Sequence, residues 1–358
     1  MITAFGGGCT RPAGEILVAP GDAPVWPSPP APARIRYVGA FRTPDDLKPE
    51  KSFWQQLAGE DKTQIKQLVA PNAVAVSPED QLFVADSDRH CVHVFDLRAR
   101  THSTIGEGTI EFPSAIARGG GRLFVADSAA GAIYVSQAGG PLRRFNESPI
   151  ARPAGLAYAP SGIGNPVVAG RPQSEIGKLF VSDLATASIH VLDDSGRTIR
   201  TFPRTTDPLE GLSTPTQLAF HSSVGLLVTD ALAGRVVRFD PEGQRLGTIG
   251  APGDAPGNLA LPRGVAIDRE GHIYVVDARF ENVQIFDAAG RVLLAFGSEG
   301  GGRGEFNLPA GICIDAHDRI WVADTYNCRV QVFQFLGAPE DASSPSAIAS
   351  APDGGKSP

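Results

Sequence analysis

One six-residue pattern occurs six times in this chain, and it limits the fold more than any other feature. Each copy alternates aliphatic and aromatic residues and ends in aspartate, which is typical of a half-buried β-strand. The copies QLFVAD, RLFVAD, KLFVSD, GLLVTD, HIYVVD and RIWVAD end at Asp86, Asp127, Asp183, Asp230, Asp277 and Asp324. Their spacing of 41 to 56 residues predicts an array of similar supersecondary units.

Three other short segments accompany each copy. A proline lies 14 or 15 residues before five of the six aspartates and is followed by a small apolar run such as NAVAV (72–76). After the aspartate come a second strand-like run, such as CVHVFD (91–96), and usually a third, such as THSTIG (101–106). Each unit is therefore predicted to be a four-stranded antiparallel sheet. Six such sheets arranged radially form an all-β, six-bladed β-propeller.

The last unit lacks its fourth strand, because the chain becomes polar and rich in proline and serine after Phe333. A matching segment, IRYVGAF (35–41), precedes the first unit. We expect this N-terminal strand to close the ring as the outer strand of the last blade, because an unpaired edge strand is a liability. The predicted propeller therefore spans residues 34–336, and residues 337–358 are expected to form a disordered tail.

The repeats resemble the NHL family of propellers. The stretches 297–333 and 250–286 match the family pattern best, and the resemblance extends over about residues 35 to 335. It implies a six-bladed β-propeller. It leaves the function open, because propellers support unrelated activities.

Three segments differ from the repeat pattern. Residues 1–33 are predicted to be a flexible, proline-rich tether, in which Cys9 is either a lipid attachment site or a stray cysteine in a disordered terminus. The stretch 43–70 has apolar residues partly at helical spacing and is interpreted as a helical or loop insertion, either a decorated loop or a docking element. The Gly- and Pro-rich stretch 161–177 is an insertion in the third unit.

The charge and the cysteine pattern argue against several classes of function. A formal net charge of -7 disfavours a nucleic-acid partner, and no run of 18 apolar residues predicts a spanning helix. The four cysteines show no CxxC spacing. Cys91 and Cys328 would be neighbours in a closed ring and are interpreted as two free thiols, with a disulfide as the alternative.

The resemblance also implies two kinds of enzyme, the calcium-dependent lactonases and the peptidyl-amidoglycolate lyases. Both place metal ligands around the central channel, whereas the innermost strands here offer almost none apart from Asn72 and Gln217. The histidines show no HxxxH or HExxH spacing. We therefore predict no catalytic residues, no metal and no cofactor, and we assign the six aspartates a structural role in their turns.

Binding is the remaining interpretation. The turns after each aspartate and the loops between blades should gather on one face, where large side chains provide interface anchors. The candidate binding residues, expected to be exposed around blades 5, 6 and 1, are Arg89, Arg263, Phe280, Arg303 and Tyr326. The hypothesis is a monomeric, non-catalytic propeller that is tethered at a bacterial cell envelope and binds a protein, peptide or glycan. The alternatives are a propeller enzyme and a cytoplasmic location.

Overall fold

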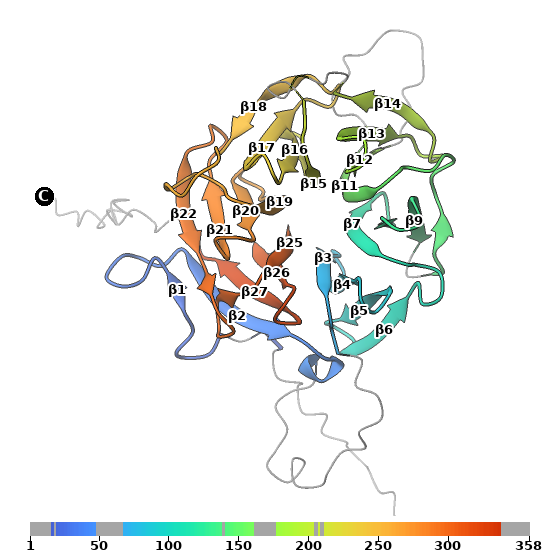
Figure 1. Cartoon of the computed structure of the whole chain (residues 1–358). Helices are drawn as coiled ribbons and strands as arrows, with labels where there is room; N and C mark the ends of the chain where they lie inside the picture. Colours follow the sequence, from blue (N-terminus) through green and yellow to red (C-terminus); the bar gives the residue numbers. More distant parts are fainter. Residues whose placement is uncertain are drawn as a thin grey trace, which may run out of the picture.

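The described residues form six antiparallel sheets that stand radially around one channel (Figure 1). This computed structural model describes residues 16–17, 19–47, 67–137, 140–160, 177–203, 207 and 211–337. Each sheet is one blade, with its strands following one another from the channel to the rim. The prediction of an all-β, six-bladed propeller is confirmed.

The blades are numbered along the chain from the first inner strand. Blade 1 contains β3 (Pro71–Val76), β4 (Gln81–Asp86), β5 (Cys91–Asp96) and β6 (Thr101–Ile105). Blade 2 contains β7 (Pro113–Gly119), β8 (Arg122–Asp127), β9 (Ala132–Gln137) and β10 (Arg143–Arg144). Blade 3 contains β11 (Pro153–Ala159), β12 (Lys178–Asp183), β13 (Ser188–Leu192) and β14 (Thr198–Phe202). Blade 4 contains β15 (Pro215–His221), β16 (Gly225–Asp230), β17 (Arg235–Phe239) and β18 (Arg245–Ile249). Blade 5 contains β19 (Pro262–Ile267), β20 (Ile273–Asp277), β21 (Asn282–Phe286) and β22 (Val292–Phe296). Blade 6 contains β25 (Pro309–Ile314), β26 (Arg319–Asp324), β27 (Arg329–Phe335) and β2 (Ile35–Phe41).

The second strand of a blade is buried on both faces, so the prediction of half-buried strands is wrong for these segments. In β4, Leu82 and Val84 pack into a cluster shared with blade 6, whereas Phe83 and Ala85 pack into a cluster shared with blade 2. The reason is the radial arrangement, which places every blade between two others. This explains why the repeated hexapeptides contain so few polar residues.

The inner strands lie close together around the channel, and β25 is the neighbour of β3. Small residues two positions after the starting proline permit this approach. A Cβ atom on Gly311 would lie 2.6 Å from the carbonyl oxygen of Asn72, and one on Gly264 would collide with the carbonyl oxygen of Ala310. Glycine is therefore required at both positions, and the channel stays narrow.

The last blade includes a segment from each end of the propeller. Strand β2 pairs with β27, with Ile35 opposite Phe335 and Phe41 opposite Val330. A further short strand, β1 (Val25–Trp26), pairs with β2 and extends the sheet.

The N-terminal segment packs against the propeller at Trp26. The indole ring lies 5.8 Å, between centroids, from each of the rings of Phe296 and Phe333. The prediction of a flexible tether up to residue 33 is therefore wrong for this stretch, because the aromatic contacts hold it against blades 5 and 6.

Strand direction gives the ring two different faces. Each inner strand begins with a proline paired with the repeat aspartate, as Pro71 is with Asp86. These prolines, the aspartates and the turns between the second and third strands therefore share one face, which we call the Asp face. On the opposite face, Ile16 and Leu17 border a cleft beside Asp80 in the first turn of blade 1, and β27 also ends there. Both described ends of the chain thus lie on the opposite face.

Several predicted segments lie outside the described residues. They include residues 1–15 with Cys9, most of the insertion 43–70, residues 161–176 and the tail from 338. Of the first insertion, the short 3-10 helix η1 (Pro44–Leu47) is described, and Leu47 is buried between blades 6 and 1. A two-stranded parallel pair, β23 (Ser298–Glu299) and β24 (Glu305–Phe306), lies in the connection between blades 5 and 6. The described part of the chain contains no helix with the length and apolarity needed to span a membrane.

Deletion of residues 34–41 would remove β2 and leave β27 as an open edge. We expect a lower thermal unfolding midpoint and concentration-dependent association, because unpaired backbone groups of an edge strand recruit other strands. Circular dichroism melting and size-exclusion chromatography with light scattering would measure both. A chain lacking residues 341–358 is the control. A deletion variant as stable and monomeric as the control would contradict ring closure by β2.

Candidate functional site

The six repeat aspartates are buried on the Asp face, where each is at most 1% exposed. Asp127 accepts backbone N–H bonds from Glu111 and Phe112, before its inner strand, and from Ala129 and Ala130, in the following turn. The N···O distances are 2.7 to 3.1 Å. A carboxylate with this many donors is well satisfied as a buried anion. It therefore acts as a clamp between the loop that enters a blade and the turn inside it.

Asp86 has a histidine as an additional neighbour. Burial alone would raise the pKa of Asp86, but the nearby His93 ring and the backbone N–H groups of Val69 and Ala70 outweigh it, so the pKa is lowered. The Nε2 atom of His93 lies 3.6 Å from the Asp86 carboxylate, and its Nδ1 lies 2.9 Å from Nε2 of His102. His93 is buried and His102 is partly exposed, and this pair supports the clamp from within blade 1.

Hydroxyl groups connect neighbouring blades at the mouth of the channel on the same face. The Thr229 hydroxyl donates to the carbonyl oxygen of Arg263 at 2.9 Å, which links blades 4 and 5. The Thr325 hydroxyl donates to the carbonyl oxygen of Pro71 at 2.7 Å, which links blades 6 and 1. The backbone at the mouth is therefore fixed, and a side chain such as that of Arg263 projects from a rigid support.

The predicted binding residues of the hairpin turns differ in exposure. Tyr326 is 67% exposed. Arg89 is exposed, and its Nε donates to the carbonyl oxygen of Gln67. Phe280 is partly buried, and its backbone N–H donates to Asp277, so the expectation of a fully exposed ring is wrong for this residue.

Arg303 lies in the connection between blades 5 and 6, where it pairs with Asp22 at 2.8 Å. Both side chains are exposed, so this ion pair contributes only about 0–1 kcal/mol. Arg303 is exposed, as expected, and it contacts the N-terminal segment through Asp22.

Arg263 is partly buried because it lies on the inner strand β19, so the expectation of full exposure is wrong here too. Burial lowers the pKa of its guanidinium, and the nearby Tyr326 phenol partly counters this. Among the described residues, the guanidinium has no hydrogen-bond or ion-pair partner. Removing a cation from water without a partner costs free energy. The guanidinium of Arg263 is therefore available to donate hydrogen bonds to an anionic group at the channel mouth.

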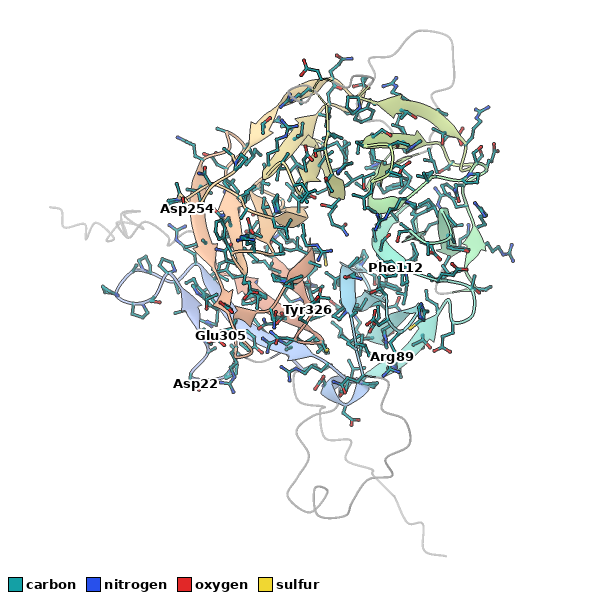
Figure 2. The ribbon with its side chains drawn as sticks, viewed as in Figure 1. Asp22, Arg89, Phe112, Asp254, Glu305 and Tyr326 are labelled. Carbon is teal, nitrogen blue, oxygen red and sulfur yellow. The ribbon has the colours of Figure 1, made fainter. Side chains whose placement is uncertain are left out.

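Three exposed apolar side chains on the Asp face were missed by the sequence analysis. Leu232 is 75% exposed, Phe112 41% and Val69 36%. Leu232 follows its repeat aspartate by two residues, as Tyr326 does, so an alignment of the repeats could have found it. We call the set Val69, Phe112, Leu232, Arg263 and Tyr326, which is distributed around the ring over blades 1, 2, 4, 5 and 6, the Asp-face patch. Figure 2 labels Phe112 and Tyr326, which belong to blades 2 and 6.

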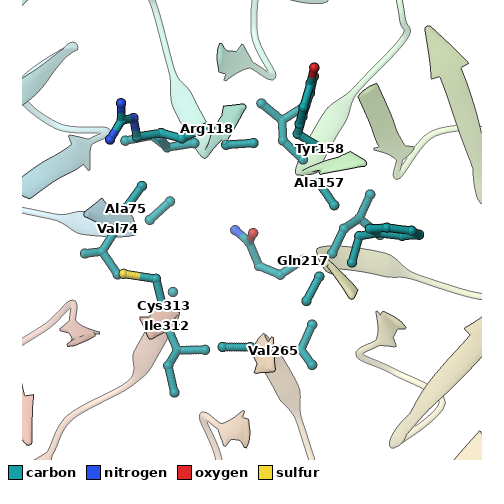
Figure 3. Close-up of a pocket in the computed structure, with 18 of the residues that line it drawn as sticks. Val74, Ala75, Arg118, Ala157, Tyr158, Gln217, Val265, Ile312 and Cys313 are labelled. Atoms are coloured by element: carbon teal, nitrogen blue, oxygen red, sulfur yellow. The ribbon is translucent and has the colours of Figure 1, made fainter. Parts of the chain in front are cut away.

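The half of the channel nearer the opposite face contains a cavity of about 280 Å³ (Figure 3). All six inner strands line it, mostly with alanine and aliphatic side chains, in agreement with their sequences. Gln217 projects into this space from β15. Burial raises the pKa of the lining thiol of Cys313, so this thiol is neutral at physiological pH.

The sequence analysis also missed Arg118 at the rim of the cavity, because the apolar run SAIA (114–117) that predicts this inner strand ends one residue before it. Its guanidinium carbon lies 5.4 Å from the ring centre of Phe83, and Nη2 lies 3.9 Å from the Glu79 carboxylate. Burial lowers the pKa of this guanidinium. Arg118 takes the place that Tyr158 and Phe220 occupy in the next two blades, where rings stack on rings. Its main role is therefore packing between blades.

Ligands for a metal ion do not converge in the part of the chain that the structure describes. No group of three or more His, Cys, Asp or Glu side chains is placed there to hold one. Cys91, Cys313 and Cys328 are free thiols, and the Cys328 thiol donates to the carbonyl oxygen of Val69.

Comparison with known proteins supports the repeat assignment. The NHL-repeat family model matches residues 68–95 and 306–333, which belong to blades 1 and 6. No curated protein matches the chain.

Several solved structures share the fold. An auxiliary nutrient binding protein from Bacteroides ovatus is 16% identical, with a TM-score of 0.57 over 74% of this chain and 69% of that one. Virginiamycin B lyase from Staphylococcus aureus is 14% identical, with a TM-score of 0.54 over 75% and 96%. The calcium-binding protein regucalcin from Agrobacterium tumefaciens is 14% identical, with a TM-score of 0.52 over 74% and 90%. At these identities the likeness concerns the fold alone.

The clamp assignment is testable at Asp127. We expect Asp127→Ala to lower the free energy of unfolding by about 2–4 kcal/mol, because four N–H groups lose a buried, charged acceptor. Asp193→Ala is the matched control, since Asp193 accepts hydrogen bonds in an exposed turn and its loss should cost about 1 kcal/mol. Urea denaturation measures both. Equal losses in the two variants would contradict the clamp.

Proposed function

Since the chain carries NHL repeats and folds into a six-bladed propeller, we propose that it is a non-catalytic binding protein whose Asp face holds a peptide segment of a partner protein. The Asp-face patch is the observation that carries this proposal. It combines exposed apolar side chains with an arginine whose guanidinium has no partner among the described residues.

The chemistry of the patch indicates the kind of segment that fits. Tyr326 and Leu232 offer apolar area to aliphatic or aromatic side chains, and Arg263 offers hydrogen bonds to a carboxylate. Tyrosine and arginine are enriched among the residues that dominate binding energy at interfaces. The proposed ligand is therefore a peptide with apolar side chains and one acidic group.

The arrangement of the chain ends supports this use of the Asp face. Ile16, Leu17 and the end of β27 all lie on the opposite face. We further propose attachment to a bacterial cell envelope through Cys9, which lies outside the described residues. A tether that continues from residue 16 would leave the Asp face open to a partner.

The alternative is an enzyme, because propellers of similar fold include a lyase and regucalcin. Two observations favour binding. The repeat aspartates are engaged by backbone N–H groups, and the described residues that line the channel cavity include no histidine, aspartate or glutamate. A propeller whose activity depended on a metal ion in the channel would have charged metal ligands among the side chains that line the channel.

The binding proposal predicts that metal removal has no effect on stability. Dialysis against a chelator should leave the thermal unfolding midpoint unchanged, and added calcium or zinc should not raise it. A specific metal at one hundred times its Kd would stabilise the fold by about 2.7 kcal/mol. Elemental analysis and thermal shift measurements provide the test. A stoichiometric metal would favour the enzyme.

The Asp face is testable with a displayed library of random peptides. We expect enriched peptides to contain apolar residues and an acidic residue, and to bind Tyr326→Ala or Arg263→Met at least about 30-fold more weakly. Phe280→Ala should have a smaller effect, because this ring is partly buried. Arg98→Met, on the opposite face, is the control. Peptides that keep their affinity for the Asp-face variants and lose it with the control would overturn the proposal.

A further inference from the structure

The channel cavity is a second candidate site, distinct from the Asp-face patch. It lies in the other half of the channel, and none of the patch residues lines it. Its volume of about 280 Å³ exceeds the roughly 150 Å³ of an engineered cavity that binds benzene, so a small organic molecule fits. The walls come from all six inner strands, which the hydroxyl links between blades hold in place.

The accessible surface of this cavity is mainly polar, although most of the side chains around it are small and apolar. Within the described sheets, each inner strand pairs with one other strand, the second strand of its own blade. The backbone N–H and C=O groups on its other edge therefore lack a ladder partner and face the channel. A ligand with polar groups can form hydrogen bonds with them, which a purely apolar ligand cannot do.

Arg118 gives the cavity its charge. Among the described residues that line the cavity, it is the one charged side chain, and no carboxylate is present among them. Its Nη2 lies 3.9 Å from the Glu79 carboxylate, which is 67% exposed, so this ion pair is weak. Because an arginine stays protonated in proteins, the open end of the cavity has a positive potential.

Two nitrogen atoms of this guanidinium lack acceptors. Nε and Nη1 of Arg118 are buried and have no hydrogen-bond partner among the described residues. By contrast, Arg122 at the other end of the same turn is paired with Asp194. Burying the donors of a cation without acceptors costs free energy, which an anionic ligand would recover.

The repeat shows that packing alone does not require a cation at this position. The corresponding residues in the other inner strands are Val76, Tyr158, Phe220, Ile267 and Ile314. Tyr158 and Phe220 stack on a ring of the preceding blade, and Arg118 lies over the corresponding ring of Phe83. Since the arginine side chain has many rotamers, its guanidinium can turn from Phe83 into the cavity when an anion is present.

Gln217 is a second polar side chain in this space, and Figure 3 shows it directed into the cavity. Its Nε2 donates to the carbonyl oxygen of Ser114 at 3.3 Å. A primary amide has two N–H groups, so one of them remains for a ligand acceptor. Ser114 and Arg118 lie on the same strand, β7, at a separation of roughly 13 Å. Gln217 and Arg118 therefore lie toward opposite ends of the cavity, and a ligand that meets both is elongated.

We propose that the channel cavity binds a small, elongated organic anion. Its carboxylate accepts hydrogen bonds from Arg118 at the open end of the cavity, and an oxygen at its other end accepts one from Gln217. This site goes beyond the peptide surface on the Asp face and does not depend on it.

Adipamate, hexanoate and hexanamide are suitable probes, because they share a chain of the same length and differ in their end groups. Adipamate carries a carboxylate and an amide, hexanoate only the carboxylate and hexanamide only the amide. Isothermal titration calorimetry and saturation-transfer NMR should rank their affinities in this order. We expect hexanoate to bind about 3- to 10-fold more weakly than adipamate, because it lacks the acceptor for Gln217, and hexanamide at least about 10-fold more weakly than hexanoate.

Substitutions at two positions test which side chain holds which end of the ligand. Arg118→Met should weaken adipamate and hexanoate at least about 10-fold, because it removes the charged donor. Arg118→Tyr copies Tyr158 of the next blade, so it should keep the fold and show the same loss. Gln217→Met should weaken adipamate by about 3- to 10-fold and leave hexanoate unchanged.

Two control variants and a folding check complete the test. Arg98→Met changes an exposed arginine of the opposite face outside the cavity lining, and Arg263→Met changes the Asp face, so neither should affect adipamate. Circular dichroism melting verifies that each variant is folded. Hexanamide that binds as tightly as hexanoate, or unchanged adipamate affinity in a folded Arg118 variant, would overturn the proposal. So would the absence of binding by all three probes.

Discussion

The ring depends on six buried carboxylates that accept backbone N–H bonds. Each one accepts a backbone N–H bond from the loop that enters its blade. Four of them also accept backbone N–H bonds from the turn at the end of the second strand, as Asp127 does from Ala130, whereas Asp230 and Asp324 pair with an arginine at the start of the third strand. These loop N–H groups belong to no strand ladder, so without the carboxylate they would lose their acceptor within the protein. The clamp therefore fixes where each blade begins relative to the blade before it, and six repetitions fix the ring.

The close approach of the inner strands follows from small residues and determines what the channel can do. At Gly264 and Gly311 the neighbouring backbone occupies the space of a side chain. What remains is a small cavity bounded by the hydrogen bond from Gln217 to Ser114, and no carboxylate is among the described residues that line it.

The two faces of the ring have different characters. The Asp face carries Arg263 and exposed apolar side chains on rigid turns, because the clamps and hydroxyl links lie directly beneath them. The opposite face holds the described chain ends and the open side of the cavity.

The sequence by itself determined the repeat unit, the number of blades and the segment 35–41 that pairs with the last blade, because these follow from local patterns of apolar residues, proline and aspartate. It also placed Tyr326 and Arg263 on the face of the repeat aspartates. Only the tertiary structure decided which of the polar side chains have a hydrogen-bond or ion-pair partner within the described part of the chain. Arg303 meets Asp22 and Gln217 meets Ser114 across long separations in the chain, and Arg263 is left without a partner among the described residues. Such pairings depend on how blades and termini pack, and a repeat pattern, which describes one blade at a time, does not contain them.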